Sequence, residues 1–306
     1  MYVPLEARAP RPLGAVSPLE EMGAYEWLWK QQGSEIKPTF RSIAEFFRQH
    51  PKALPSDLVP LDEAMACGKE VLKQFKSRGI DHFGIRLHKA GDYPEMLTDA
   101  ENPLELLYYQ GDWDLVYSPR RVAVVGTRTP SNEAIRSTKA LVKDLVNDNF
   151  VVVSGLAAGI DTVAHEAAME SGGKTIAVIG TPLSEAYPKN NRDLQKKIAD
   201  EHLLISQIPV LRYLEQDFRL NRFFFPERNV TMSALTQATI IVEAGETSGT
   251  LTQARAALAQ GRKLLILERN FHSKLTWPLR FEGRGAKRVR NYGDIVEHLA
   301  LGSSSD

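Results

Sequence analysis

The stretch FVVVSGLAAGIDTVAHEAA, residues 150–168, decides the fold because it joins a strand to a helix through a glycine-spaced loop. The opening apolar run is typical of a buried strand, and small alanines recur on one face of the helical pattern that follows. Glycine-rich loops between a strand and a helix commonly bind phosphate. This loop contains no lysine or arginine, and it places a carboxylate, Asp161, at the start of the helix. What such a loop binds is therefore an open question.

The same alternation of strand and helix continues from Arg121 to the end of the chain. The strand-like runs are RVAVVG (121–126), FVVVSG (150–155), KTIAVIG (174–180), LLISQ (203–207), ATIIVEA (238–244) and KLLILE (263–268). Helical patterns separate most of them, which predicts an α/β fold with a mostly parallel sheet and helices on both faces. After the first run, Thr129 and Pro130 have the sequence of a helix cap and a first helical residue.

The chain before this alternation has a different character. Residues 1–18 are proline-rich and aperiodic, which predicts a loose N-terminal arm. Residues 19–79 show apolar spacings of three and four, which predicts a helical N-terminal region. Residues 80–118 are irregular apart from one strand-like run, and residues 301–306 are expected to form a short tail.

Composition narrows the class of protein. The 306 residues are 43% apolar and 25% charged with zero net charge, so any nucleic-acid affinity must come from a local patch. No apolar run approaches the ~20 residues of a membrane span, so no membrane association is expected. The single cysteine, Cys67, excludes an intrachain disulfide and a cysteine-rich zinc site, and it fits a reducing cytoplasm. We expect neither a metal nor a cofactor.

The loops that follow the strands share a chemistry. Carboxyl ends of parallel strands meet at one edge of a sheet, and ligands bind at that edge. Here the edge would contain Gly126, Thr127, Arg128, Ser154, Gly155, Gly159, Ser248, Gly249 and Thr250. Backbone N–H groups, helix N-termini and one arginine would together favour an anion. None of the loops is a dinucleotide fingerprint or an ATP-binding loop, and the alternative is that the glycines only permit tight turns.

A second constellation, FRLNRFFFPERN, occupies residues 218–229. Its arginines Arg219, Arg222 and Arg228 alternate with phenylalanines, and this alternation suits single-stranded nucleic acid, because guanidinium groups bind phosphate and aromatic faces stack on unpaired bases. The alternative is a set of core phenylalanines with solvated arginines, and we expect at least two of residues 223–225 to be core. The segment 269–290 holds seven basic residues and one acid, and is equally compatible with DNA contact and with a solvated loop.

Asp161 and His165 lie four residues apart on one predicted helix face. Such a pair could be a general base with its orienting residue, or two metal ligands. No third ligand stands nearby in the sequence. We therefore favour a structural brace, in which Asp161 accepts N–H groups at the helix start and His165 forms a local hydrogen bond.

The motifs VAVVGTR, SGLAAGIDTVAHEAAMESGGKTIAVIGT, FPERN and EAGETSGTLTQARAALAQGRKLLIL are collinear. As a set they resemble the DNA-processing protein A (DprA/Smf) family over about residues 80–300. The resemblance implies an extended Rossmann-like domain, here preceded by a small helical N-terminal region. It also implies a homodimer that binds single-stranded DNA and loads the RecA recombinase during natural transformation, without catalytic turnover.

The resemblance assigns roles to particular positions. Arg128 matches an arginine expected to meet a phosphate, and Gly155 and Gly159 match the loop that closes the pocket. The family motif Asn-Phe-Pro-x-Arg-Asn-Arg is matched at Phe225, Pro226, Arg228 and Asn229, but Phe224 stands in place of its asparagine and Val230 in place of its last arginine. These two departures put one phosphate contact in doubt.

Two other functions fit the same fold class. Related phosphoribohydrolases carry catalytic carboxylates where this chain has Thr252 and Gln253, neither of which is a general base near neutral pH. A sensor of a nucleotide-like ligand, for instance in defence against phage, would use the same edge. The FPERN motif and the basic segment favour a polymeric ligand.

Overall fold

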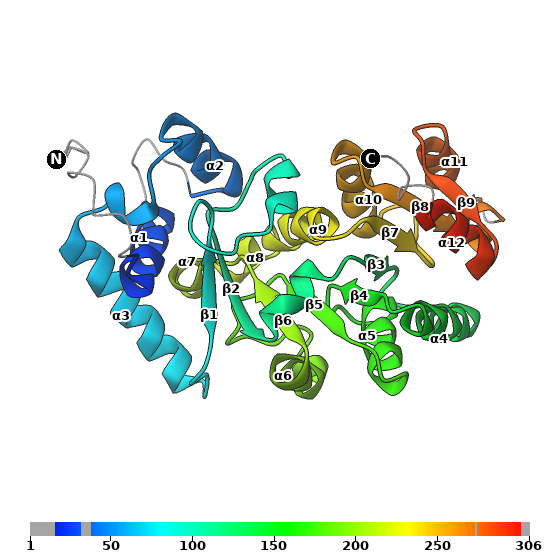
Figure 1. Cartoon of the computed structure of the whole chain (residues 1–306), viewed down its shortest axis with the longest axis horizontal. Coiled ribbons are helices and arrows are strands. Elements are labelled where there is room, and N and C mark those ends of the chain that lie inside the picture. The colour runs from blue at the N-terminus through cyan, green and yellow to red at the C-terminus, as the bar shows by residue number, and fades with distance from the viewer. Residues whose placement is uncertain (1–15, 32–37, 273, 301–306) are drawn as a thin grey trace. The chain divides into compact units, whose positions relative to one another are not determined.

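The computed structural model of the protein describes residues 16–31, 38–272 and 274–300 and shows an α/β protein (Figure 1). It divides into two compact units. Unit 1 comprises Met1–Gln110, Thr181–Glu185 and Ser206–Phe224, and unit 2 comprises Gly111–Gly180, Ala186–Ile205 and Phe225–Asp306. The predicted arm, up to residue 15, and the predicted tail 301–306 lie outside the described residues.

Unit 2 is built on parallel strands, as predicted. Its strands are β3 (Arg121–Val125), β4 (Val151–Ser154), β5 (Thr175–Ile179), β6 (Leu203–Ser206), β7 (Ala238–Ile241), β8 (Lys263–Leu267) and β9 (Lys287–Val289). Their order is β6-β5-β4-β3-β7-β8-β9. β3 pairs in parallel with both β4 and β7, and the pairs β4–β5, β7–β8 and β8–β9 are also parallel. The six predicted strands are confirmed, whereas β9 was not predicted.

Helices connect these strands in the alternation that the sequence predicts. They are α4 (Asn132–Asn147), α5 (Ile160–Glu170), α6 (Arg192–Glu201), α9 (Phe224–Ala234), α10 (Thr250–Ala259), α11 (Trp277–Glu282) and α12 (Tyr292–Ala300), with short 3₁₀ turns η3 (Trp113–Tyr117), η4 (Lys189–Asn191) and η5 (Glu268–Phe271). Valines and isoleucines of the central strands form one buried cluster with the apolar faces of α4 and α5. Strand order reverses beside β3, so the carboxyl ends of β3, β4 and β7 are neighbours at a topological switch point.

The predicted start of α4 is wrong by two residues. The helix begins at Asn132 and not at Pro130, because Ser131 supplies the cap. Its hydroxyl accepts the N–H of Ala134 at 3.1 Å, whereas the N–H of Thr129 bonds to the Thr127 hydroxyl in the preceding turn.

Unit 1 contains the predicted helical region and an antiparallel strand pair. Its elements are α1 (Pro18–Lys30), α2 (Phe40–Gln49), η1 (Pro55–Asp57), α3 (Leu61–Ser77), β1 (Gly84–Leu87), η2 (Glu95–Asp99), β2 (Leu106–Gly111), α7 (Val210–Glu215) and α8 (Phe218–Asn221). α1 lies against α3 so closely that a Cβ at Gly23 would overlap the backbone of Ala64. None of the described helices is long and apolar enough to cross a membrane.

One of the three consecutive phenylalanines is a core residue, so the expectation of at least two is wrong. Phe224 is buried, and its ring lies 6.0–6.4 Å from those of Trp29, Phe40 and Tyr213. Phe225 is half-buried and Phe223 is exposed. The reason is local geometry, since Phe223 lies in the turn before α9, and Phe224 and Phe225 point in different directions at the start of that helix.

Candidate functional site

The loop after β4 is closed from within by Asp161. This carboxylate is buried, and its Oδ2 accepts the N–H of Gly155 at 3.2 Å. Burial raises the pKa of Asp161, while the positive charge of Arg228 and hydrogen bonds from the backbone of Ala157 and Gly155 oppose the rise. In a phosphate-binding loop such a backbone N–H would donate to the phosphate, whereas here the Gly155 N–H donates to the carboxylate of Asp161.

Arg228 lies beneath the same loop. It is buried in α9, its Nη1 donates to the carbonyls of Gly155 and Val178, and its Nε donates to Asn229 Oδ1 at 2.9 Å. Burial lowers the pKa of Arg228 to about 10, and the negative charge of Asp161 opposes this shift. A Cβ on Gly155 would overlap the guanidinium, so a larger residue there would push Arg228 away from the carbonyls that it bonds. A phosphate could contact only those guanidinium N–H groups of Arg228 that do not already donate to these carbonyls and to Asn229.

Hydrogen bonds join the other predicted loops to this one. The N–H of Thr127 donates to the carbonyl of Glu243 at 2.7 Å, and the carbonyl of Thr127 accepts the N–H of Ile160 at 3.1 Å. Thr250 Oγ1 donates to the carbonyl of Gly126 at 3.2 Å. Gly159 has a φ of 82° and lies against the Thr127 carbonyl, which only glycine permits without strain. The ends of β3, β4 and β7 are thereby held together.

Several predicted ligand-binding groups are engaged inside the protein. Ser154 is buried and its hydroxyl donates to the Val124 carbonyl at 2.7 Å. Ser248 Oγ accepts the N–H of Thr250 at 3.3 Å. Asn229 Nδ2 donates to the carbonyl of Gly249 at 3.1 Å. These hydrogen bonds fix the shape of the edge, so a ligand would be contacted mainly by the side chains that remain exposed.

Arg128, Phe225 and Tyr187 lie together at this edge. Arg128 is exposed, and its guanidinium carbon lies 6.0 Å from the centroid of the half-buried Phe225 ring. Tyr187 lies 5.2 Å from the same ring and is 52% exposed. The backbone of Gly180 packs against Phe225 and would clash with it through any Cβ. A cation and two rings from distant segments thus meet on one surface.

The sequence reasoning missed Tyr187. A usable signal was present, because Tyr187 and Pro188 follow the carboxyl end of β5, on the edge where ligands were expected. Arg222 was predicted to join the site, and it belongs to unit 1. It is exposed, with its guanidinium carbon 5.0 Å from the Phe223 ring centroid.

His165 lies in the core of unit 2. Its Nδ1 is 2.7 Å from Thr175 Oγ1, and that hydroxyl donates to the Val152 carbonyl at 2.7 Å. The imidazole must therefore donate through Nδ1–H. Burial lowers the pKa of His165 to about 3, so the ring is neutral near pH 7. Over the described ranges, no group of three histidine, cysteine, aspartate or glutamate side chains could hold a metal ion.

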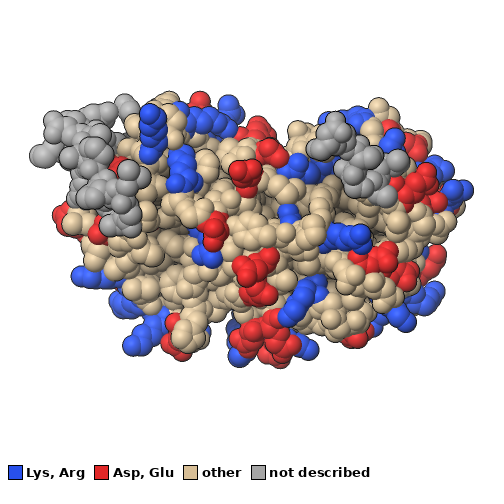
Figure 2. All heavy atoms as spheres, viewed as in Figure 1, with Lys and Arg blue, Asp and Glu red and all other residues tan. Residues whose placement is uncertain are grey.

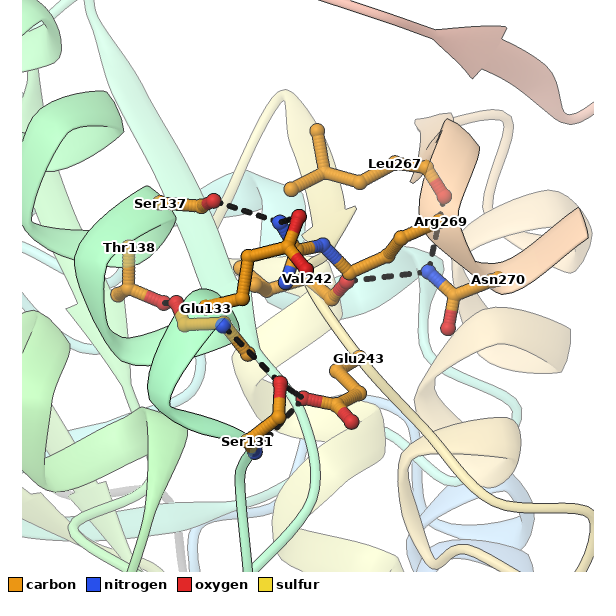
Figure 3. A network of polar contacts seen from close by, with 10 residues as sticks. Ser131, Glu133, Ser137, Thr138, Val242, Glu243, Leu267, Arg269 and Asn270 are labelled. Atoms are coloured by element: carbon orange, nitrogen blue, oxygen red, sulfur yellow. Dashed lines mark hydrogen bonds and ion pairs between the residues drawn. The ribbon is translucent and has the colours of Figure 1, made fainter. Parts of the chain in front are cut away.

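A polar network ties α4 to the ends of β7 and β8 (Figure 3). Glu243 Oε2 accepts the N–H and the O–H of Ser131 at 3.1 and 2.9 Å. Arg269 donates to Glu133 at 3.2 Å and to Ser137 at 2.6 Å. Glu243 follows the carboxyl end of β7, and its carboxylate is therefore engaged in holding α4 to that strand.

The basic segment 269–290 contains a helix and a strand, and three of its seven basic residues pair with carboxylates. It forms α11 and β9, contrary to the solvated-loop alternative. Besides Arg269, Arg290 pairs with Asp294 at 3.0 Å and Arg288 lies 3.8 Å from carboxylate oxygens of Glu268 and Glu282. Figure 2 shows acidic and basic residues interspersed on the face in view.

Comparison with known proteins places these features in a family. The family model of DNA recombination-mediator protein A matches residues 84–300. The chain is 32% identical over 230 residues to DNA processing protein DprA of Bacillus subtilis, covering 75% of this chain and 74% of that protein. It is 41% identical over 175 residues to DprA of Streptococcus pneumoniae, covering 57% and 59%.

Solved structures agree with the sequence comparison. The crystal structure of S. pneumoniae DprA superposes with a TM-score of 0.67 at 29% identity, covering 93% of this chain and 98% of that chain. The Helicobacter pylori DNA processing protein A, described for its unique single-stranded DNA binding mode, has a TM-score of 0.61 at 28% identity. That match covers 72% of this chain and 97% of the H. pylori chain.

Proposed function

Because the chain belongs to the DNA recombination-mediator protein A family, we propose that it is a single-stranded DNA binding protein of the DNA-processing type. The H. pylori relative, described for its binding of single-stranded DNA, supports the choice of ligand. The observation that carries the proposal is the exposed Arg128 guanidinium beside the Phe225 ring, with Tyr187 on that ring as well.

The chemistry follows from these three side chains. Arg128 neutralises a backbone phosphate, and the exposed aromatic faces stack on unpaired bases, whose π-faces a duplex hides. The glycine loops let the segments approach one another and give the edge its shape. Because Asp161 and Arg228 are buried, they hold the edge in place while the exposed groups make the contact. Such a site reads little sequence.

Arg128→Ala tests this assignment. We expect affinity for labelled oligonucleotides of any sequence to fall about tenfold, and the salt dependence to flatten by about one phosphate contact. Fluorescence anisotropy titration at several salt concentrations measures both, with the exposed Arg136→Ala on α4 as the matched control. Equal loss in both variants, no loss in Arg128→Ala, or equally tight binding of duplex would each contradict the proposal.

We also propose that the protein acts by binding and not by turnover. The carboxylates near the edge are committed elsewhere, since Asp161 is buried against Gly155 and Glu243 accepts hydrogen bonds from Ser131. A phosphoribohydrolase would release free base from nucleoside monophosphates, which chromatography of an overnight incubation would detect. Release of base that Glu243→Gln abolishes would establish the enzymatic alternative.

The cellular partners follow from the family resemblance. We propose a homodimer that loads the RecA recombinase onto single-stranded DNA in the cytoplasm during transformation or recombination. Light scattering at micromolar concentration tests the dimer. Filament assembly on DNA coated with single-strand binding protein tests loading. A monomeric mass, or filament growth that the protein does not accelerate, would contradict the respective part.

A further inference from the structure

Unit 1 carries a surface on which large apolar side chains are exposed. Phe218 is 77% exposed, more than any other large apolar residue in the described ranges, and Phe223 is 58% exposed. Leu220 lies between them in sequence and is also exposed. Isolated apolar residues are common at protein surfaces, but two exposed phenylalanines within six residues form a concentrated feature.

The backbone of this surface is fixed. Asn221 is buried, and its Nδ2 donates to the Tyr213 carbonyl at 3.2 Å. Phe224 is anchored three residues later in its aromatic cluster, and Asp217 Oδ1 accepts the N–H of Arg219 at 2.8 Å. Phe223 lies between these two anchors and faces solvent, and Phe218, at the first position of α8, is exposed as well. Exposure here results from packing and not from a loose loop.

A cation accompanies each exposed ring. The guanidinium carbon of Arg219 lies 5.8 Å from the Phe218 centroid, and that of Arg222 lies 5.0 Å from the Phe223 centroid. Both arginines are exposed, and neither has a carboxylate partner among the residues that the structure describes. The cationic heads and the free ring faces are therefore both available to a ligand.

We propose that Phe218, Arg219, Arg222 and Phe223 form a second subsite for single-stranded nucleic acid. Unpaired bases stack on the two rings, and the two arginines bind the phosphates that flank those bases. The subsite rests on the proposed function and extends it to unit 1. Single strands are favoured because they need both parts of this arrangement, ring faces for the bases and guanidinium groups for the phosphates.

The double variant Phe218→Ala/Phe223→Ala tests the subsite. We expect its affinity for a long oligothymidylate to fall about 10- to 100-fold, since each stacked base contributes substantially to binding. Both rings are exposed, so the thermal midpoint should equal that of the unmodified protein. Tyr117→Ala is the matched control, because it removes an exposed ring (48%) from another part of the chain. It should leave affinity unchanged.

Two further measurements separate stacking from apolar contact. Phe218→Leu/Phe223→Leu keeps apolar surface but removes the rings, and should bind as weakly as the alanine variant. An abasic oligonucleotide offers phosphates without bases, so the unmodified protein and the alanine variant should bind it equally.

The outcomes distinguish this inference from the function on which it rests. If the unmodified protein does not bind single strands, the proposed function fails. If it binds and the alanine variant binds equally well, the second subsite alone is overturned. If the leucine variant keeps full affinity, or if the alanine variant loses a dimer instead of DNA affinity, the surface is an apolar protein contact and the inference is again overturned.

Discussion

At the scale of single residues, the edge of unit 2 depends on one buried acid and one buried base. Asp161 holds the Gly155 loop from one side, and Arg228 holds it from below through the Gly155 carbonyl. Each charge offsets part of the free-energy cost of burying the other, so removing one residue would leave the other buried without its counter-charge. The exposed Arg128, by contrast, contributes little to the fold and is available to a ligand.

Asp161→Asn is expected to reduce stability before it reduces function. The amide is neutral, so Arg228 loses its counter-charge, and one acceptor oxygen is lost. We expect the free energy of unfolding to fall by about 2–4 kcal/mol, measured by urea denaturation. Asp193→Asn, an exposed acid in the first turn of α6, should change it little. A stable, folded Asp161→Asn protein that no longer binds DNA would show that Asp161 contacts the ligand.

At the scale of elements, Phe224 explains why this chain departs from the family motif at that position. The phenylalanine fills a cluster with Trp29 of α1, Phe40 of α2 and the Tyr213 ring of α7. An asparagine there would bury an amide among aromatic rings without a partner. The departure therefore serves the packing of the N-terminal helices of unit 1.

Phe224→Ala and Phe223→Ala form a matched pair on adjacent residues. Removing the buried ring should lower the free energy of unfolding by about 3–5 kcal/mol. Removing the exposed ring should change it by no more than about 0.5 kcal/mol. Hydrogen exchange should also accelerate in α1 and α2 in the first variant alone. Equal stability of the two variants would contradict the role assigned to the cluster.

At the scale of the whole molecule, buried ionisable groups in the two units respond to pH in opposite directions. In unit 1, Glu26 accepts hydrogen bonds from Tyr108 and from the N–H groups of Val210 and Leu211, yet burial raises its pKa to about 7. The folded state thus holds a proton there between about pH 4.5 and 7 that the unfolded state has lost, and stability falls as pH rises through this window. His165, with its pKa lowered to about 3, destabilises the fold as pH falls below about 6.5.

Glu26→Gln should separate these two effects. Between pH 7 and pH 5 the unmodified protein should gain about 2 kcal/mol of unfolding free energy relative to the variant, because only the carboxyl takes up the proton. In the variant no proton uptake at residue 26 opposes the destabilising effect of His165. The free energy of unfolding of the variant should therefore decline more steeply towards pH 5. Urea midpoints at pH 5, 6 and 7 measure the difference, with the exposed Glu166→Gln as control. Parallel pH profiles for Glu26→Gln and the unmodified protein would contradict the role of Glu26.

The predictable part of this protein is local in origin. The six strand runs and the helical region at the N-terminus were read from spacing and β-branched content, because these patterns act over a few residues. The short β9 was missed, since three residues with two exposed basic side chains have no periodic signal. The cap of α4 was misplaced because two polar residues on either side of Pro130, Thr129 and Ser131, are both suitable caps. In the structure Ser131 is the cap, and its hydroxyl also bonds to Glu243.

The sequence by itself determined the α/β alternation, the edge on which loops would gather and the family. Tertiary structure alone decided which polar groups face a ligand. Arg128 and Arg228 look alike in sequence, but one is exposed beside Phe225 and the other is buried under Gly155. Tyr187 joins the first of them from a distant segment. The physical reason is that burial and partnership are properties of contacts between segments far apart along the chain, and no local spacing encodes them.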